Sequence, residues 1–344
     1  MLRDLTIQGY RCFKDFHIDD LARVNLLVGP NNAGKTSFLE AVYLLVGQDK
    51  PLCLAEMLYY RDELSESPKS RRLSDALNGG ASYQIGHVFN GHELKRGQKI
   101  KLQSQKDQPL SLEIHLRSKQ NGNAPAFLRF SDSETTLQIR SGGTVHIQRR
   151  ESLITPIYSH PFIPGTGLSV EEMSNLWDLI TLTPQEENVV KALQILEAGV
   201  ERISFTSGRN TMSDILVKLR GQSTRIPLSS MGDGMRRILV LAMAAVVAKD
   251  GFMFVDEIDT GLYYETQTDM WRLLIETARR LNVQIFAATH SWDCVKAFQN
   301  ALTKAQDDSA GKLFRLEKLD ERIKSVGYTA RDLEIAVRQQ IEVR

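Results

Sequence analysis

The sequence lacks the features that mark several large classes of protein. It has three cysteines, far apart and without a CxxC pair, so neither a disulfide framework nor a zinc site of sequence-local thiols is expected: Cys12, Cys53 and Cys294. No apolar run in it approaches the ~20 residues that a membrane-spanning helix needs. These absences predict a soluble, cytoplasmic protein with no membrane partner.

An excess of either charge is also absent. Lys and Arg number 43 against 42 for Asp and Glu, so the formal net charge of +1 gives no overall attraction to nucleic acid or to a membrane. Neither GxSxG nor HExxH occurs, which leaves hydrolases of the nucleophile-elbow type and metalloproteases without a basis. Any binding of nucleic acid would depend on local basic clusters.

A glycine-rich loop lies between a predicted strand and a predicted helix. Residues 23–29 form an apolar run that ends in glycine, and residues 35–47 carry apolar side chains at helical spacing. The segment between them fits GxxxxGK[ST], with Gly29, Pro30, Asn31, Asn32, Ala33, Gly34, Lys35 and Thr36, followed by Ser37. The alternative is a glycine turn before an ordinary helix.

This loop predicts a site for ATP and Mg²⁺. The glycines let backbone amides face the phosphates, and the helix start adds positive potential. Lys35 would reach the β and γ phosphates, and the Thr36 hydroxyl would be a magnesium ligand.

Polar side chains follow two later strands. The segment GFMFVDEI ends in Asp256 and Glu257, whose charges are costly on a buried strand unless a metal or polar site receives them. Ligands collect at the carboxyl ends of parallel strands, so we expect Asp256 to hold magnesium and Glu257 to activate the attacking water. His290 follows the next strand and is expected at the same edge, bonded to the γ phosphate or to water. The alternatives are a solvated turn and a structural histidine.

Alternating strand and helix patterns predict an α/β protein with a mostly parallel sheet. We expect one domain over residues 1–344, with a polar, β-rich insert at 60–150, a helical insert at 160–200 and a further lobe at 225–295. The antiparallel patterns of the first insert are predicted to form a separate β subdomain.

The order of these motifs resembles the ABC ATPase superfamily, and the opening LTIQGYRCFKDFHIDDLARVNLLVGPNNAGKTSFLEAV is similar to its SMC, RecF and OLD branch. The resemblance implies an ABC-type P-loop NTPase core and conversion of ATP to ADP and phosphate. It covers residues 1–50 and 225–295, whereas 60–150 match nothing assignable. Gln84 is a candidate for the Q-loop glutamine of the family.

In place of the family's LSGGQ signature, this chain has LSSMGDGMRR at residues 228–237. The resemblance implies that Ser230 and Gly232 face the γ phosphate held by a second copy in a head-to-tail homodimer, with Ser229 as an alternative for the serine. The residues alone also fit a helix with Ser230 as N-cap and Asp233 three positions later. Asp259 lies where the family has its D-loop, although the closest members often carry glutamate and histidine nearby.

OLD enzymes join such an ATPase to a TOPRIM nuclease, but 54 residues follow His290 in the chain of 344, too few for a domain of ~100 residues. The resemblance therefore implies an ATPase that regulates a separate effector, such as a nuclease in bacteriophage defence. Two alternatives stay open. One is a DNA-repair-type ATPase that binds nucleic acid through Lys69–Arg72, Lys95–Lys101 and Arg149–Arg150. The other is an ATP-gated scaffold without hydrolysis.

Overall fold

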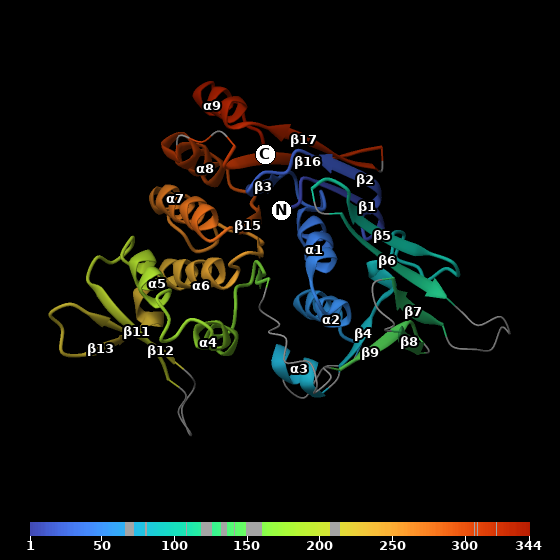
Figure 1. Cartoon of the computed structure of the whole chain (residues 1–344), viewed down its shortest axis with the longest axis horizontal. Coiled ribbons are helices and arrows are strands. Elements are labelled where there is room, and N and C mark those ends of the chain that lie inside the picture. The colour runs from blue at the N-terminus through green and yellow to red at the C-terminus, as the bar shows by residue number, and fades with distance from the viewer. Residues whose placement is uncertain are drawn as a thin grey trace. The chain divides into compact units, whose positions relative to one another are not determined.

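The computed structural model describes residues 1–65, 72–79, 81–107, 109–117, 126–131, 136–140, 142–148, 160–206, 214–305, 307, 309–320 and 322–344. The chain divides into two compact units, and Figure 1 shows the elements of both. The first unit comprises Met1–Leu21, Pro30–Ile157 and Leu316–Val326, and the second comprises Ala22–Gly29, Tyr158–Arg315 and Gly327–Arg344.

An eight-stranded antiparallel sheet forms the first unit, in the order β2-β1-β5-β6-β7-β8-β9-β4. Alternating apolar residues give it one buried face, as along β6, where Leu112, Ile114 and Leu116 are buried. Its strands are β1 (Asp4–Tyr10), β2 (Phe13–Asp19), β4 (Ala81–Gln84), β5 (Lys99–Ser104), β6 (Leu110–Arg117), β7 (Phe127–Phe130), β8 (Thr136–Arg140) and β9 (Thr144–Ile147).

The helices of the first unit follow the glycine-rich loop. Helix α1 is buried on nearly all sides, which explains why its apolar residues are not confined to one stripe. The other helical elements are α2, a short α3 and a single 3₁₀ turn. Their bounds are α1 (Lys35–Val46), α2 (Lys50–Tyr60), α3 (Leu73–Gly79) and η1 (Gly86–Val88).

The second unit contains most of a six-stranded sheet in the order β10-β14-β15-β3-β16-β17, of which the end of β16 and most of β17 fall in the residue range of the first unit. Its first five strands pair in parallel, and β3 and β15 are buried along their whole length, as expected for a sheet covered on both faces. The strands are β3 (Val24–Val28), β10 (Phe162–Ile163), β14 (Phe252–Val255), β15 (Gln284–Ala288), β16 (Gly311–Leu319) and β17 (Arg322–Tyr328).

Helices α6, α7, α8 and α9 lie side by side in the second unit (Figure 1). Next to them, two short helices lie within residues 160–200, the segment predicted to be a helical insert, and an antiparallel three-stranded sheet follows that segment. The bounds are α4 (Val170–Asp178), α5 (Glu186–Leu193), β11 (Val200–Thr206), β12 (Asp214–Leu219), β13 (Arg225–Pro227), η2 (Leu228–Met231), α6 (Asp233–Val247), α7 (Tyr264–Arg280), α8 (Trp292–Ala305) and α9 (Ala330–Arg338). The α/β fold with a mostly parallel sheet, an antiparallel subdomain and a helical insert is thus confirmed.

One local prediction is wrong. Ser230 is not the N-cap of the helix that follows it, because residues 228–231 form the 3₁₀ turn η2 and α6 begins at Asp233. Gly232 is the N-cap residue, with φ 90° and ψ 162°, a conformation that favours glycine. The extra turn moves the helix start by two residues and leaves Ser230 exposed.

No helix within the described ranges is both long and apolar enough to cross a membrane.

Candidate nucleotide site

The glycine-rich loop leaves β3 at Gly29 and enters α1 at Lys35. Gly34 has φ 92°, which favours glycine, and a Cβ there would lie 2.8 Å from Cys12 Sγ and 3.0 Å from Ile323 Cδ1. A side chain at this position is therefore disfavoured both by the backbone conformation and by the lack of space. Asn32 also has a positive φ, of 64°, as asparagine tolerates better than most residues.

Lys35 is folded back over its own loop. Its side chain is buried, and Nζ donates a hydrogen bond to the Pro30 carbonyl oxygen at 3.0 Å. No described side chain caps the start of α1, and the first turn carries no acidic residue. The amides at this helix start, together with the lysine, suit a polyphosphate, because both favour negative charge.

A buried ionic cluster fixes α1 behind the loop. The Glu40 carboxylate pairs with Arg11 Nε at 2.8 Å and with Arg61 Nε at 2.6 Å, and it accepts a hydrogen bond from the Tyr10 hydroxyl. Burial and the nearby carboxylate raise the pKa of Tyr10, so this hydroxyl stays a donor. Arg61 Nη2 also donates to Ser37 Oγ at 3.2 Å, a contact with the loop that sequence reasoning missed.

The carboxyl ends of the central strands in the second unit are level with one another. Val255 of β14 lies opposite Ala287 of β15, and Ala288 lies opposite Leu27 of β3. The residues that follow these strands therefore emerge at one edge of the sheet, as the sequence predicted for the polar residues after β14 and β15.

Glu257 and His290 meet at this edge. His290 Nε2 lies 3.2 Å from Glu257 Oε1, and their side chains are 36% and 38% exposed, so the pair is open to solvent. Gly165, after β10, also lies close to the glutamate, since a Cβ there would be 3.0 Å from Glu257 Cγ.

A buried arginine holds the turn that carries these acidic residues. Arg237 of α6 is 6% exposed; its Nη2 donates to the carbonyl oxygens of Asp256 and Glu257 at 2.9 and 2.6 Å, and its Nε donates to that of Ile258 at 3.3 Å. Desolvation lowers the pKa of Arg237 to about 10, against the opposing effect of Asp259, so the guanidinium stays charged at neutral pH. Sequence reasoning missed this residue. The signal was an arginine pair at the start of a helix that is otherwise apolar on nearly all sides.

The segment after the acidic turn contacts the start of α6. The Asp259 carboxylate accepts a hydrogen bond from the Thr289 hydroxyl at 2.5 Å. A Cβ on Gly261 would lie 3.3 Å from Asp233 Cβ, and one on Gly234 would lie 3.2 Å from the Gly261 carbonyl oxygen. Backbone therefore packs against backbone here.

Comparison with protein families decides the broad class. Residues 1–140 and 169–295 match the model of the AAA ATPase domain family. The chain belongs to this family. The ATPase is of the ABC type, in the branch of SMC and RecF proteins, and it uses ATP with Mg²⁺.

Among curated proteins, the ATPase is 22% identical over 368 aligned positions to an ATP/GTP phosphatase of Helicobacter pylori, with 97% of each chain covered. It is 33% identical over 100 residues to the DNA double-strand break repair Rad50 ATPase of Archaeoglobus fulgidus, and 54% identical over 44 residues to the DNA replication and repair protein RecF of Vibrio campbellii. These two matches cover 11% and 12% of the relatives.

Solved SMC heads have the same fold. An SMC head bound to the C-winged helix domain of ScpA aligns with a TM-score of 0.53 at 14% identity, covering 98% of this chain and 99% of that one. A head domain with an extended coiled coil, bound to the C-terminal domain of ScpA derived from Pyrococcus furiosus, aligns with a TM-score of 0.50 at 12% identity, covering 99% of each.

The residues of the ATPase fit a magnesium ion that takes most of its ligands from phosphate and water. Among the described residues, no group of three or more His, Cys, Asp or Glu side chains could hold a metal ion. Thr36 is the second residue of α1, and the half-buried Asp256 follows β14 directly. A hydroxyl and a single carboxylate are oxygen ligands of the kind that magnesium accepts beside a nucleotide.

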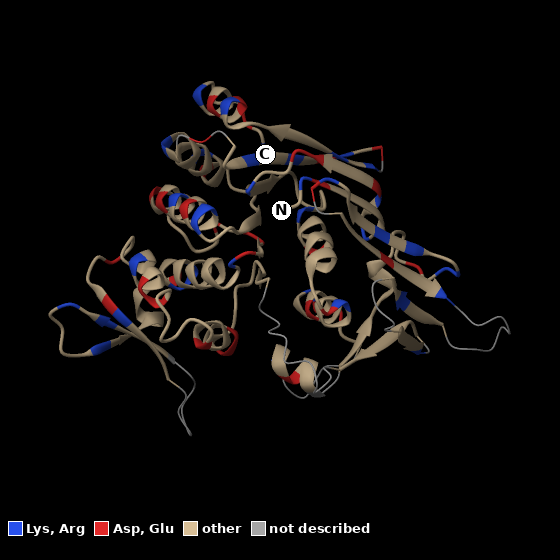
Figure 2. Cartoon of the chain, viewed as in Figure 1, with Lys and Arg blue, Asp and Glu red and all other residues tan. Residues whose placement is uncertain are grey.

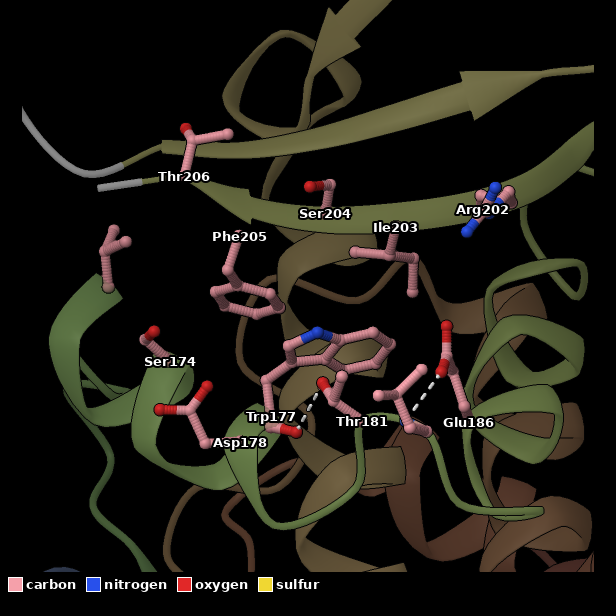
Figure 3. A pocket seen from close by; sticks show the side chains of 12 residues that line it. Ser174, Trp177, Asp178, Thr181, Glu186, Arg202, Ile203, Ser204, Phe205 and Thr206 are labelled. Carbon is pink, nitrogen blue, oxygen red and sulfur yellow. Dashed lines mark hydrogen bonds between the residues drawn. The ribbon is translucent and has the colours of Figure 1, made fainter. Parts of the chain in front are cut away.

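A cavity of about 450 Å³ lies away from these residues, between α4 and β11. The Trp177 and Phe205 rings stack there with centroids 5.4 Å apart, and Arg202 and Glu186 lie towards one end of the cavity (Figure 3). None of the site residues predicted from the sequence lines it.

Proposed function

We propose that the ATPase hydrolyses ATP with the loop Gly29–Ser37 as the phosphate site and the edge after β14 and β15 as the source of the catalytic groups. The close Glu257–His290 pair carries this proposal. The Glu257 carboxylate would accept the proton of the attacking water, and His290 would orient that water or donate to the γ phosphate. Thr36 and Asp256 would hold Mg²⁺, which would supply positive charge beside the phosphates.

The second part of the proposal is a homodimer that closes around ATP. The start of α6 supports it, because Ser230 and Gly232 are exposed and no described atom lies within 4 Å of a Cβ built on Gly232. No described side chain caps this helix start, so its amides can receive a phosphate held by a second copy. Asp259 would contribute to the same interface through the segment that touches α6.

Light scattering with and without ATP tests the dimer. Glu257→Gln should accumulate as an ATP-bound dimer, because binding is kept while hydrolysis stops. Adding Ser230→Arg should return it to a monomer, whereas Ser223→Arg, at an exposed serine in the turn before β13, should not. A dimer that persists with Ser230→Arg would refute the role of the signature segment.

We propose further that the nucleotide state is passed to a separate protein effector in the cytoplasm, such as a nuclease in bacteriophage defence. The motif order similar to OLD proteins supports this, as does the SMC head solved with ScpA bound to it. The test is binding of the neighbouring gene product to Glu257→Gln with ATP and to Lys35→Ala. Equal binding to both variants would contradict nucleotide control.

Direct binding of nucleic acid is the second candidate, favoured by the partial matches to Rad50 and RecF. Figure 2 shows acidic and basic residues interspersed along α7. On β5, Lys99 and Lys101 are two positions apart, so they lie on the same face of the strand. Lys95, just before them, pairs with Glu93 at 2.8 Å. Of the other clusters, Lys69, Ser70, Arg71, Arg149 and Arg150 lie outside the described residues.

A salt titration of duplex DNA binding distinguishes the two candidates. Contact with phosphates predicts an affinity that falls steeply with salt and is weakened by Lys99→Glu with Lys101→Glu. No binding at low salt, with ATPase activity intact, would leave the protein effector as the target.

A further inference from the structure

The acidic turn after β14 has a backbone that an isolated glutamate would rarely adopt. Glu257 has φ 49°, in the left-handed region, where a side chain is disfavoured by contact with its own backbone. Such a conformation persists only where the surroundings hold it.

The left-handed residue makes three successive carbonyl oxygens converge. In an extended strand, successive carbonyls point in opposite directions, so one group cannot bind three in a row. Here the oxygens of Asp256, Glu257 and Ile258 all accept hydrogen bonds from the Arg237 guanidinium, at 2.9, 2.6 and 3.3 Å. A planar fork with several donors can satisfy such an arrangement, whereas the single ammonium of a lysine cannot match it.

Two neighbours also lie close to the glutamate side chain. Gly165 comes so close that a Cβ there would be 3.0 Å from Glu257 Cγ, and His290 Nε2 lies 3.2 Å from Glu257 Oε1. The backbone conformation sets the direction in which the side chain leaves the main chain, and these neighbours limit the position of the carboxylate group. Release of the backbone would therefore move the carboxylate even though both neighbours stay in place.

We propose that Arg237 is a positioning residue for hydrolysis, which fixes the left-handed turn at Glu257 and so aims its carboxylate. Arg237 acts through the backbone and touches no reacting atom. The inference rests on the proposed function, in which Glu257 is the base. Hydrolysis would then depend on a residue of α6, the helix that begins within the signature segment.

The test compares Arg237→Gln and Arg237→Lys with Arg272→Gln. Arg272 is the control, because it is an exposed arginine of α7 that pairs with Asp269 of its own helix at 3.0 Å and lies outside the signature segment. In Arg237→Gln, kcat should fall about 100-fold, the loss typical of a misplaced catalytic group, while the Kd for ATP stays within about twofold. In Arg237→Lys, which keeps the charge but not the fork, kcat should fall about 10-fold. Arg272→Gln should retain its turnover.

A double-mutant comparison separates positioning from general loss of structure. If Arg237 acts only through Glu257, adding Arg237→Gln to Glu257→Gln lowers the residual turnover no further. A further fall of the same size as in the wild-type background would overturn the proposal, as would a kcat for Arg237→Gln within about twofold of wild type.

These variants distinguish failure of the proposed function from failure of the positioning role. If Glu257→Gln alone turns over normally, the proposed function fails and the base lies elsewhere. If Glu257→Gln is inactive and Arg237→Gln is active, the proposed function stands and the positioning role fails. Should Arg237→Gln not fold, Arg237→Lys, which keeps a long cationic side chain, decides: turnover equal to wild type refutes the role of the fork.

Discussion

The glycine-rich loop and the acidic turn each contain a left-handed residue, but of different types. The loop uses Gly34, where a Cβ has no space and glycine costs nothing in strain. The turn has Glu257, the proposed base, at its left-handed position, and the guanidinium of Arg237 on α6 binds the carbonyl oxygens of this turn. A glycine in the sequence suggests a left-handed backbone, whereas a glutamate gives no sign that its backbone is strained.

The largest effect on ATP binding is expected at the loop. Lys35→Ala removes a charged donor to the phosphates, so the affinity for ATP should fall at least about 100-fold. Titration with a fluorescent ATP analogue measures it, with Lys14→Ala, an exposed lysine of β2, as the control. Wild-type affinity in Lys35→Ala would refute the assignment of the loop.

The acidic turn should show the opposite pattern. Glu257→Gln should lower kcat by about 10²–10⁴, the usual contribution of a general base, with the Kd for ATP unchanged. Phosphate release measures kcat, and Glu276→Gln, on the exposed side of α7, is the control. A variant that hydrolyses ATP normally would remove Glu257 as the base.

A smaller effect is expected at the partner of the glutamate. His290→Ala removes one hydrogen-bonding group from the edge, so kcat should fall about 100-fold or less. Single-turnover hydrolysis measures the chemical step directly. Full activity would show that the contact at 3.2 Å only orders the resting state.

The smallest effect compares two left-handed glycines of the first unit. Gly34 and Gly91 have φ 92° and 90°, but no described atom lies within 4 Å of a Cβ on Gly91. Gly91→Ala should cost about 1–2 kcal/mol of unfolding free energy from backbone strain. Gly34→Ala should cost about 1–3 kcal/mol more through its clash with Cys12. Urea denaturation measures both changes in unfolding free energy. Equal changes would show that the neighbours of Gly34 move to accommodate the added methyl group.

The same contrast explains what could be predicted from the sequence. The order β3, loop, α1 was predicted because a glycine pattern, an apolar strand and helical spacing agree over adjacent residues. The meeting of Glu257 and His290 followed from the rule that parallel strands end at one edge. Both predictions depend on patterns within short stretches of sequence.

Other features depend on residues distant in the sequence. Ser230 was expected to cap α6, but the 3₁₀ turn before it makes Gly232 the cap, and no local pattern distinguishes the two. Arg237 is 20 positions away from the Glu257 carbonyl that it binds. Arg61 contacts Ser37 across 24 positions. Such contacts depend on how helices pack, which spacing alone does not specify.

Two glycines remove the side chains that would otherwise separate the start of α6 from the segment behind the acidic turn, at Gly234 and Gly261. Where main chain rests on main chain, there is no rotamer to absorb a displacement, and close-packed atoms transmit it. The two segments should therefore shift as one rigid piece. If a second subunit binds at the start of α6, as proposed, this contact would carry any displacement of α6 to the segment that follows Glu257, the proposed base.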